Sequence, residues 1–361
     1  MRSPEFYQRH LDAVSRSFAL CIPQLDPPFR DRVALSYLLL RVLDTVEDAT
    51  FPDRRVQQRL FTTFHKFLQK RPGPAEVEAF RASFPAGLSD GERALLADTE
   101  ALIEDAHELP APARKVVLGA TARMAQGMAG YARRGVPLRL LDVEDVCRYC
   151  CFVAGLVGEL LTRLWALRGG TPPPMLRAYR FGLFLQKVNI LKDQGEDEAV
   201  GRFLVPDRRE LLTSLRGDAE GALAYLTALP REERGYRIFC AWSLMLGAGA
   251  LAQLDGPRES RRAETARLLT RTAEIAQDDD ALRRQFAALL PGLPEPRPQV
   301  PADRRPVVDR RADRIGRAVG SSGARDRRQS VGVADFDVDL PPFAAGGDVD
   351  PPEYVGAHPC A

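Results

Sequence analysis

The stretch YLLLRVLDTVED, residues 37–48, ends an apolar helical pattern with three carboxylates in five residues. At 100° per residue, a polar stripe forms on an otherwise leucine- and valine-rich helix. Its members are Tyr37, Arg41, Asp44 and Asp48. Because a carboxylate loses its hydration in an apolar interior, these groups need a compensating charge. We therefore expect the stripe to face a cavity inside the protein rather than bulk water.

A second stripe of the same design follows in FLQKVNILKDQGEDEAVGR, residues 184–202. Its members, which share one helical face, are Gln186, Asn189, Asp193 and Asp197. Both stripes end in the pattern D-x-x-x-D, with a glutamate just before the second aspartate. Carboxylates four residues apart on a helix repel one another, so each pair requires a cation.

Hard divalent cations meet that requirement. Mg²⁺ prefers oxygen ligands and commonly sits between carboxylates and the phosphates of a substrate. Two facing D-x-x-x-D pairs therefore predict a group of Mg²⁺ ions that binds and activates a diphosphate, with Glu47 and Glu196 as further candidate ligands. Arg41, Lys192 and Arg202 would supply positive charge to the diphosphate oxygens. The alternative, that both segments are solvent-exposed acidic helix ends, is less favoured because two matched pairs are present.

Helical periodicity dominates the chain to about residue 290, and β-branched alternation is nearly absent. These features predict one all-α domain over residues 1–290. The net charge of +2 gives no electrostatic case for nucleic acid as a partner. No apolar run reaches the roughly 20 residues that span a bilayer, and the longest, residues 239–254, fits a buried core helix. We expect a cytoplasmic protein without a transmembrane segment, with peripheral membrane contact if its substrate is a lipid.

Residues 291–361 differ in character, being rich in Pro, Arg, Gly and Asp. Low hydrophobicity combined with dense charge predicts a disordered tail. Binding of anionic lipid or RNA by its arginines is the alternative to a merely solvated segment.

The segment DVCRYCCFVAGLVGELLTRLWAL, residues 145–167, combines clustered cysteines with small residues. Cys147, Cys150 and Cys151 lack a second CxxC or paired histidines to complete a tetrahedral metal site, so core packing is the preferred interpretation. Gly155 and Gly158 allow a close approach, either by a neighbouring helix or by a slender apolar ligand. The sequence leaves both interpretations of the glycines open.

Four blocks resemble, in the same order, the head-to-head isoprenoid synthases of the squalene/phytoene synthase family. They are SRSFAL (15–20), YLLLRVLDTVED (37–48), YCCFVAGLVG (149–158) and GLFLQKVNILKDQGED (182–197). A weaker block, LFTTFHKFLQ (60–69), lies at the family's usual distance after the first aspartate motif. The resemblance spans nearly all of residues 5–290. DTVED and the LVG of the third block are more similar to the squalene-forming branch, whereas GRFLVP (201–206) is similar to the phytoene- and dehydrosqualene-forming branch.

The resemblance implies an isoprenoid synthase fold around a central cavity and a farnesyl-diphosphate farnesyltransferase activity. Mg²⁺ and two farnesyl diphosphate molecules would be bound, one diphosphate would leave, and the other molecule's double bond would attack the allylic cation. Proton loss would close a cyclopropane to give presqualene diphosphate, and a hydride from NADPH would then trap a rearranged cation as squalene. Clustered metal ions would stabilise the leaving group, and an apolar pocket would shield the cation from water.

The resemblance also implies the site residues, motif by motif. The metal ligands would be Asp44, Asp48, Asp193 and Asp197. Tyr149 matches the family tyrosine that assists cyclopropane formation, and Arg41 matches a position that holds diphosphate or orders the site, so we count it among the candidate catalytic residues. The positions that match substrate-binding residues are Ser15, Arg16, Ser17, Phe18, Tyr37, Gln186, Asn189, Lys192 and Arg202.

The sequence departs from the family pattern in two places. The basic segment expected to bind NADPH appears only as RESRRA (258–263), where Arg261 and Arg262 are the candidates. The hydrophobic C-terminal anchor of eukaryotic members is replaced by the polar tail, so we expect a soluble or peripheral enzyme of bacterial origin.

Alternatives to this activity remain open. Within the family, the reaction would stop at presqualene diphosphate, or yield dehydrosqualene or phytoene without NADPH. In another class, the chain would be a non-catalytic helical protein that binds prenyl lipids. Such a protein has no need of four aspartates and Tyr149 together, which favours an enzyme.

Overall fold

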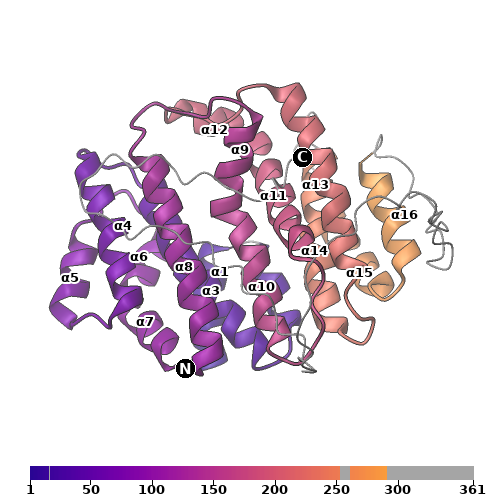
Figure 1. Ribbon diagram of the computed structural model, residues 1–361, viewed down its shortest axis with the longest axis horizontal. Helices are drawn as coiled ribbons and strands as arrows, with labels where there is room; N and C mark the ends of the chain where they lie inside the picture. Colours follow the sequence, from indigo (N-terminus) through magenta and orange to yellow (C-terminus); the bar gives the residue numbers. More distant parts are fainter. Residues whose placement is uncertain (16, 253–260, 291–361) are drawn as a thin grey trace, which may run out of the picture. The chain divides into compact units, whose positions relative to one another are not determined.

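The computed structural model describes residues 1–15, 17–252 and 261–290 (Figure 1). In chain order the elements are α1 (Pro4–Val14), α2 (Phe18–Cys21), the 3₁₀ segment η1 (Ile22–Gln24), α3 (Phe29–Asp48), α4 (Arg54–Gln69), α5 (Pro74–Ala82), α6 (Asp90–Ala97), α7 (Thr99–Glu108), α8 (Ala111–Ala132), β1 (Leu138–Arg139), α9 (Val143–Cys150), the π-helical segment η2 (Cys151–Gly155), α10 (Leu156–Ala166), α11 (Met175–Lys192), α12 (Gln194–Ala199), β2 (Arg202–Phe203), α13 (Arg208–Leu226), α14 (Arg234–Ala252), α15 (Arg261–Ile275) and α16 (Asp279–Leu289). The all-α fold class predicted from the sequence is confirmed.

Side-chain caps determine where several helices begin. Asp53 accepts a hydrogen bond from Arg55 N at 2.8 Å before α4, and Asp207 accepts one from Glu210 N at 2.9 Å before α13. These bonds satisfy backbone N–H groups that have no partner in the first turn of a helix. Such caps occur at short polar residues between apolar periodic segments.

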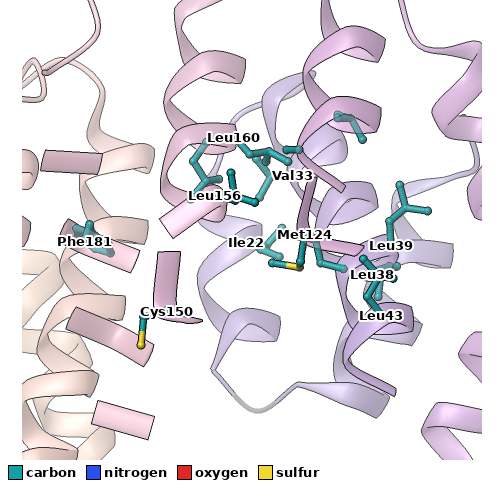
Figure 2. Packing of buried hydrophobic residues seen from close by; sticks show 14 of the residues in the cluster. Ile22, Val33, Leu38, Leu39, Leu43, Met124, Cys150, Leu156, Leu160 and Phe181 are labelled. Atoms are coloured by element: carbon teal, nitrogen blue, oxygen red, sulfur yellow. The ribbon is translucent and has the colours of Figure 1, made fainter. Parts of the chain in front are cut away.

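Helix α3 carries the first acidic stripe and is fixed by its apolar faces. Its fully buried residues include Leu35, Leu38, Leu39, Val42 and Leu43. The helix packs against α1, α7 and α8. Figure 2 shows Leu156 and Leu160 of α10 pointing into the space that holds Val33 of α3 and Met124 of α8. Each fully buried leucine contributes about 1.5–3 kcal/mol, so the position of the carboxylates at the end of α3 is strongly determined.

Two glycines determine how closely α10 and α11 approach. A Cβ at Gly158 would lie 2.0 Å from the carbonyl oxygen of Ala178, and one at Gly182 would lie 2.1 Å from that of Ala154. Any larger residue at either position would therefore force the two backbones apart. Of the two interpretations of the small residues in 145–167, these contacts support close helix packing.

The second acidic stripe spans two helices instead of one. Asp193 lies between α11 and α12, with φ −100° and ψ 9°. Asp193 N donates to Asn189 O and Asp197 N donates to Asp193 O, both at 2.9 Å, so the helical hydrogen bonds continue through the break. Asp197 therefore stays near the end of α11 although it belongs to the short helix α12.

Strands β1 and β2 form a two-residue parallel ribbon, which the sequence did not predict. Leu138 pairs with Arg202 and Arg139 with Phe203. The ribbon joins the loop after α8 to the loop after α12, and α12 and the start of α9 lie at the same upper end of the bundle in Figure 1. It therefore fixes Arg202 at the end where the acidic stripes terminate.

Two described stretches, Val143–Ala166 and Arg234–Ala252, are long and apolar enough to cross a membrane by length and composition. They are 67% and 56% buried inside the protein. Burial of this extent agrees with the prediction of a core helix over residues 239–254. Cys147, Cys150 and Cys151 are also buried, as the core-packing interpretation predicts.

Some predictions fall outside the described residues. They concern Arg16 and the tail 291–361. Arg261 begins α15, but the side chains of Arg261 and Arg262 are also outside the description. The domain boundary near residue 290 and the central cavity stay predictions.

Replacing Gly182 by alanine should destabilise the protein by roughly 1–3 kcal/mol, because the new methyl group would collide with the Ala154 carbonyl. Gly217, in α13, is the matched control, since nothing lies within 4 Å of a Cβ there. Gly217→Ala should stabilise the protein by up to about 1 kcal/mol through helix propensity. Urea unfolding of both variants measures the difference, and equal free energies of unfolding would contradict the close packing of η2 on α11.

Candidate functional site

Arg202 in strand β2 contacts carboxylates from both acidic stripes. Its Nη1 donates to Asp48 Oδ1 at 2.7 Å, and its Nε lies 3.5 Å from Asp197 Oδ1. Asp48 ends α3 and Asp197 belongs to α12. The two D-x-x-x-D motifs, far apart in the sequence, thus lie on either side of one guanidinium group.

Tyr149 and Glu47 complete this group. The Tyr149 hydroxyl donates to Glu47 Oε1 at 3.0 Å and accepts from Arg202 Nη2 at 3.0 Å. Burial and the Glu47 carboxylate raise the pKa of Tyr149 well above its ordinary value, so the phenol keeps its proton at neutral pH. Glu47 lies one residue off the stripe on a helical wheel, yet its side chain is only 13% exposed and turns inward.

Arg41 lies among the carboxylates of the first stripe. Its Nη1 is 3.7 Å from Asp44 Oδ2 and 4.0 Å from Asp48 Oδ2, and its Nη2 donates to Glu92 Oε1 at 3.1 Å. Glu92 also caps α6, where its Oε2 accepts hydrogen bonds from Ser89. The S-x-x-E pattern could have revealed the cap, but the contact with Arg41 depends on how α6 packs against α3.

The charge of these carboxyl groups is only partly compensated. Burial and the neighbouring Asp48 raise the pKa of Asp44 to about 7, although Arg41 opposes the shift. Burial also raises the pKa of Glu47 to about 7, against the effect of Arg202. The same cause raises the pKa of Asp197. Since these shifts mean that the ionised forms are disfavoured, additional positive charge would stabilise the site.

Two guanidinium N–H groups beside these carboxylates lack an acceptor. In the described part of the chain, the Nε atoms of Arg41 and Arg202 are buried and make no hydrogen bond. A buried donor without an acceptor is unfavourable. Arginine presents its donors in a planar fork that matches phosphate oxygens. Both Nε atoms are therefore candidates to bind an anionic ligand.

The donor atoms of the site suit a hard divalent cation. They are carboxylate oxygens, which Mg²⁺ prefers. Among the described residues, no three Asp, Glu, His or Cys side chains converge as a ready-made metal site. Mg²⁺ does not need such a cage, because it usually keeps several waters and combines one or two carboxylates with substrate phosphates. The residues that would hold it are Asp44, Asp48, Asp193 and Asp197, with Glu47 and Glu196 as further candidates.

The predicted substrate-binding segment near the N-terminus forms an aromatic group with α3 and α14. Ser15 Oγ accepts from Phe18 N at 3.0 Å, which closes the turn before α2, and Ser17 is exposed. The Phe18 ring centroid lies 5.2 Å from that of Tyr37 and 6.2 Å from that of Phe239. Aromatic faces of this kind stabilise cations.

The remaining predicted residues lie along α11. Gln186 is half-buried and Asn189 is exposed. Lys192 is exposed, and its Nζ lies 3.2 Å from Asp193 Oδ2. The cation that joins the two motifs is therefore Arg202, whereas Lys192 compensates the charge of Asp193, the next residue in the sequence.

A buried lysine that the sequence analysis did not single out fixes α11 behind the site. Lys187 Nζ donates to Asp218 Oδ2 at 2.6 Å, to Ser214 Oγ at 2.7 Å and to Cys147 Sγ at 3.1 Å. Asp218 and Ser214 lie on α13, and Cys147 lies on α9, two residues before Tyr149. This network ties the helix with the second stripe to the helix with the tyrosine. The only signal in the sequence was a charged residue at a position where burial is expected.

Comparison with known proteins agrees with the resemblance seen in the sequence. A family profile described as Squalene/phytoene synthase matches residues 11–209. The squalene synthase of Yarrowia lipolytica is 38% identical over 207 residues, a match that covers 54% of this chain and 44% of the relative. The squalene synthase of Eremothecium gossypii is 30% identical over 278 residues, covering 68% of this chain and 61% of the relative. The chain thus spans about half the length of the curated relatives it matches.

Solved structures show the same fold. The structure described as "The complex structure of TcSQS with ligand, BPH1237" is 27% identical, with a TM-score of 0.65, and the match covers 79% of this chain and 89% of that chain. A dehydrosqualene synthase in complex with a ligand is 18% identical, with a TM-score of 0.50, and the match covers 75% and 95% of the two chains. At 18% identity the likeness concerns the fold alone.

Replacing Lys187 by methionine should destabilise the protein by roughly 3–5 kcal/mol, because Asp218 would stay buried without its partner. The double variant Lys187→Met/Asp218→Leu should recover most of that loss, since no unpaired charge remains. Urea unfolding of both single variants and the double variant measures the coupling between the two residues. If the free energy of unfolding lost in the double variant equals the sum of the losses in the two single variants, the ion pair is contradicted.

Proposed function

This chain belongs to the squalene/phytoene synthase family, and we propose that it condenses two farnesyl diphosphate molecules head to head and reduces the product to squalene. The reaction would need Mg²⁺ and would use NADPH as hydride donor. The observation that carries the proposal is the contact of Arg202 with carboxylates of both acidic motifs, beside Tyr149. The relatives named squalene synthase support this choice within the family. Residues 1–290 would be the catalytic domain, and residues 291–361 a disordered tail.

The arginines of the site would bind the diphosphate. The Nε atoms of Arg41 and Arg202 have no hydrogen-bond acceptor, and phosphate oxygens would provide one. Mg²⁺, when bound, would neutralise charge that develops on the departing diphosphate and so favour cleavage of the allylic C–O bond. Because a metal ligand must be deprotonated, Asp44 and Glu47 would release protons as the site fills.

Tyr149 would move the proton that is lost when the cyclopropane closes. The diphosphate leaves with the electron pair of the C–O bond, and the second molecule's double bond forms the new C–C bond. Loss of one proton from carbon then closes the ring. The phenol, held between Glu47 and Arg202, would accept this proton on its oxygen and pass its own proton to Glu47. In the alternative, the departing diphosphate accepts the proton directly, and the Tyr149 hydroxyl would then orient that diphosphate.

Aromatic and apolar residues would protect the cations from water. Phe18, Tyr37 and Phe239 lie close together, and such rings would stabilise a cation bound beside them. NADPH, when bound, would supply the hydride that traps the final cation, with Arg261 and Arg262 as candidates to hold its phosphate groups.

One feature of the sequence favours a second candidate within the family. The basic segment expected for NADPH appears only as RESRRA. An enzyme without the hydride step would release presqualene diphosphate, or would form dehydrosqualene or phytoene. A non-catalytic prenyl-lipid binder is less favoured, because the Tyr149 hydroxyl donates to the Glu47 carboxylate and accepts from Arg202, an arrangement suited to passing the phenol proton to Glu47.

Product analysis tests the proposed function. The purified chain is incubated with farnesyl diphosphate, with Mg²⁺ or with EDTA, and with or without NADPH. We expect no consumption with EDTA, presqualene diphosphate with Mg²⁺ alone, and squalene when NADPH is added. Presqualene diphosphate or dehydrosqualene under both Mg²⁺ conditions would support the second candidate. A failure to consume farnesyl diphosphate in every condition would reject both.

Replacing Tyr149 by phenylalanine should lower kcat by roughly 10²–10⁴-fold, the range for losing a positioned proton-transfer group. The fold should be retained, because the ring keeps its edge contact with Tyr131 at 5.1 Å. Tyr131→Phe is the matched control, since the Tyr131 hydroxyl contacts Asp145 and not the carboxylate site. Initial rates of diphosphate release measure both variants, and similar rates for the two would count against a role for the Tyr149 hydroxyl.

The affinity for Mg²⁺ should rise as the pH increases through about 7, where the pKa values of Asp44 and Glu47 lie. Below that pH the carboxyl groups hold protons that the metal must displace, and above it they do not. Calorimetric titrations in buffers of different ionisation enthalpy measure both the affinity and the protons released. A pH-independent affinity without proton release would show that these carboxyl groups do not bind the metal.

A further inference from the structure

Large apolar side chains are exposed around the β1–β2 ribbon. Among the described residues, the three most exposed large hydrophobic side chains are Leu141 (77%), Val200 (63%) and Val136 (55%). Each lies two residues from an end of β1 or β2. Single exposed apolar residues are ordinary on protein surfaces, but a group of them at one place marks an interaction site.

The register of the ribbon brings two of these residues together. Leu138 N donates to Gly201 O just before the paired residues, which brings Val136 close to Gly201, the residue that follows Val200. A Cβ at Gly201 would lie 3.2 Å from Val136 Cγ1, so the two loops do touch here. Leu141 follows β1 at its other end. The ribbon thus presents an apolar pair and a third apolar side chain to solvent.

The charge around these side chains is mixed on the β1 side, because exposed Asp142 and Glu144 follow Leu141 at the start of α9. Residues 133–141 contain three arginines and no acidic residue. Arg134 is paired with Asp145 at 2.6 Å, which leaves Arg133 and Arg139 as the exposed charges. The Arg139 guanidinium lies 3.7 Å from the centroid of the Phe203 ring, so its side chain lies over the ribbon. On the other side of the ribbon, α12 carries exposed glutamates that anionic groups would repel.

We propose that this ribbon surface, made of Arg133, Val136, Arg139, Leu141 and Val200, docks on an anionic lipid bilayer. Apolar side chains enter the boundary between headgroups and acyl chains, and the two arginines attract anionic headgroups. Docking would be confined to the five residues of the ribbon surface, because α12 and the start of α9 both carry exposed acidic residues.

The position of the ribbon surface relates membrane docking to catalysis, and this step of the inference rests on the proposed function. Arg202, the residue that joins both acidic motifs, follows Val200 by two positions and lies in the ribbon itself. A docked ribbon would hold the carboxylate site next to the bilayer. A substrate with a C15 chain would then enter from the membrane, and a hydrocarbon product would return to it without crossing water.

Vesicle co-sedimentation of the full-length chain tests the surface. The vesicles contain phosphatidylcholine alone or phosphatidylcholine with phosphatidylglycerol. We expect binding to the anionic vesicles, and a loss on the order of tenfold in the variant Val136→Glu/Leu141→Glu/Val200→Glu, which removes the apolar contacts and adds repulsion. The variant Arg133→Gln/Arg139→Gln should weaken binding less and reduce its dependence on salt.

The variant Leu167→Glu/Leu176→Glu is the matched control. Both leucines are exposed large apolar residues, at 42% and 44%, but they lie at the end of α10 and the start of α11, away from the ribbon. The control should bind vesicles as the unmodified chain does. Failure of the unmodified chain to bind, or equal binding by the triple variant, would overturn the proposal. Sedimentation showing a dimer that the triple variant dissociates, without vesicle binding, would overturn it in favour of self-association.

Turnover of farnesyl diphosphate in detergent separates this inference from the proposed function. The triple variant should turn over the detergent-dispersed substrate as the unmodified chain does, because its three side chains are exposed and the bond from Val200 N to Asp197 O involves backbone atoms alone. Turnover without vesicle binding would overturn the docking surface and leave the proposed function standing. Vesicle binding that depends on the ribbon, without turnover, would leave the surface standing and reject the function.

Discussion

The contact of one guanidinium group with carboxylates from two helices is the constraint on which the site depends. Arg202 bonds to Asp48 and Tyr149 and lies beside Asp197 and Glu47. Without a cation at this point, the ends of α3 and α12 would repel one another. The surrounding structure holds the arginine in place. The β1–β2 ribbon fixes its backbone, the apolar faces of α3 fix the first motif, and the buried Lys187 network fixes α9 against α11.

Arg202 does not fully compensate the carboxyl groups around it. The pKa values of Asp44 and Glu47 are raised to about 7, and the Nε atoms of Arg41 and Arg202 lack hydrogen-bond acceptors. Both kinds of group are unfavourable in a folded protein unless a ligand satisfies them. A cation would satisfy the carboxylates, and a diphosphate would satisfy the arginines. Proteins retain such unfavourable arrangements at functional sites, where the stability of the remaining fold tolerates them.

The sequence predicted the features that depend on local pattern. Helical periodicity located α3 and α11, although the second stripe continues from α11 into α12, and the pairing of two D-x-x-x-D motifs pointed to one site. It did not predict features that depend on tertiary packing. The helical wheel placed Glu47 off the stripe, yet Tyr149 draws it inward from another helix. The Lys187–Asp218 pair and the Arg41–Glu92 contact join residues distant in the sequence. The ribbon that holds Arg202 is too short for alternation to reveal.

A crystal structure with Mn²⁺ and an unreactive thiodiphosphate analogue of farnesyl diphosphate tests the central claim most directly. Anomalous scattering should place metal ions between the diphosphate and the aspartates of both motifs, with Arg41 and Arg202 donating to phosphate oxygens. Metal and diphosphate bound elsewhere, with Arg202 still bonded only to Asp48 and Tyr149, would contradict the assignment of these residues to the reaction.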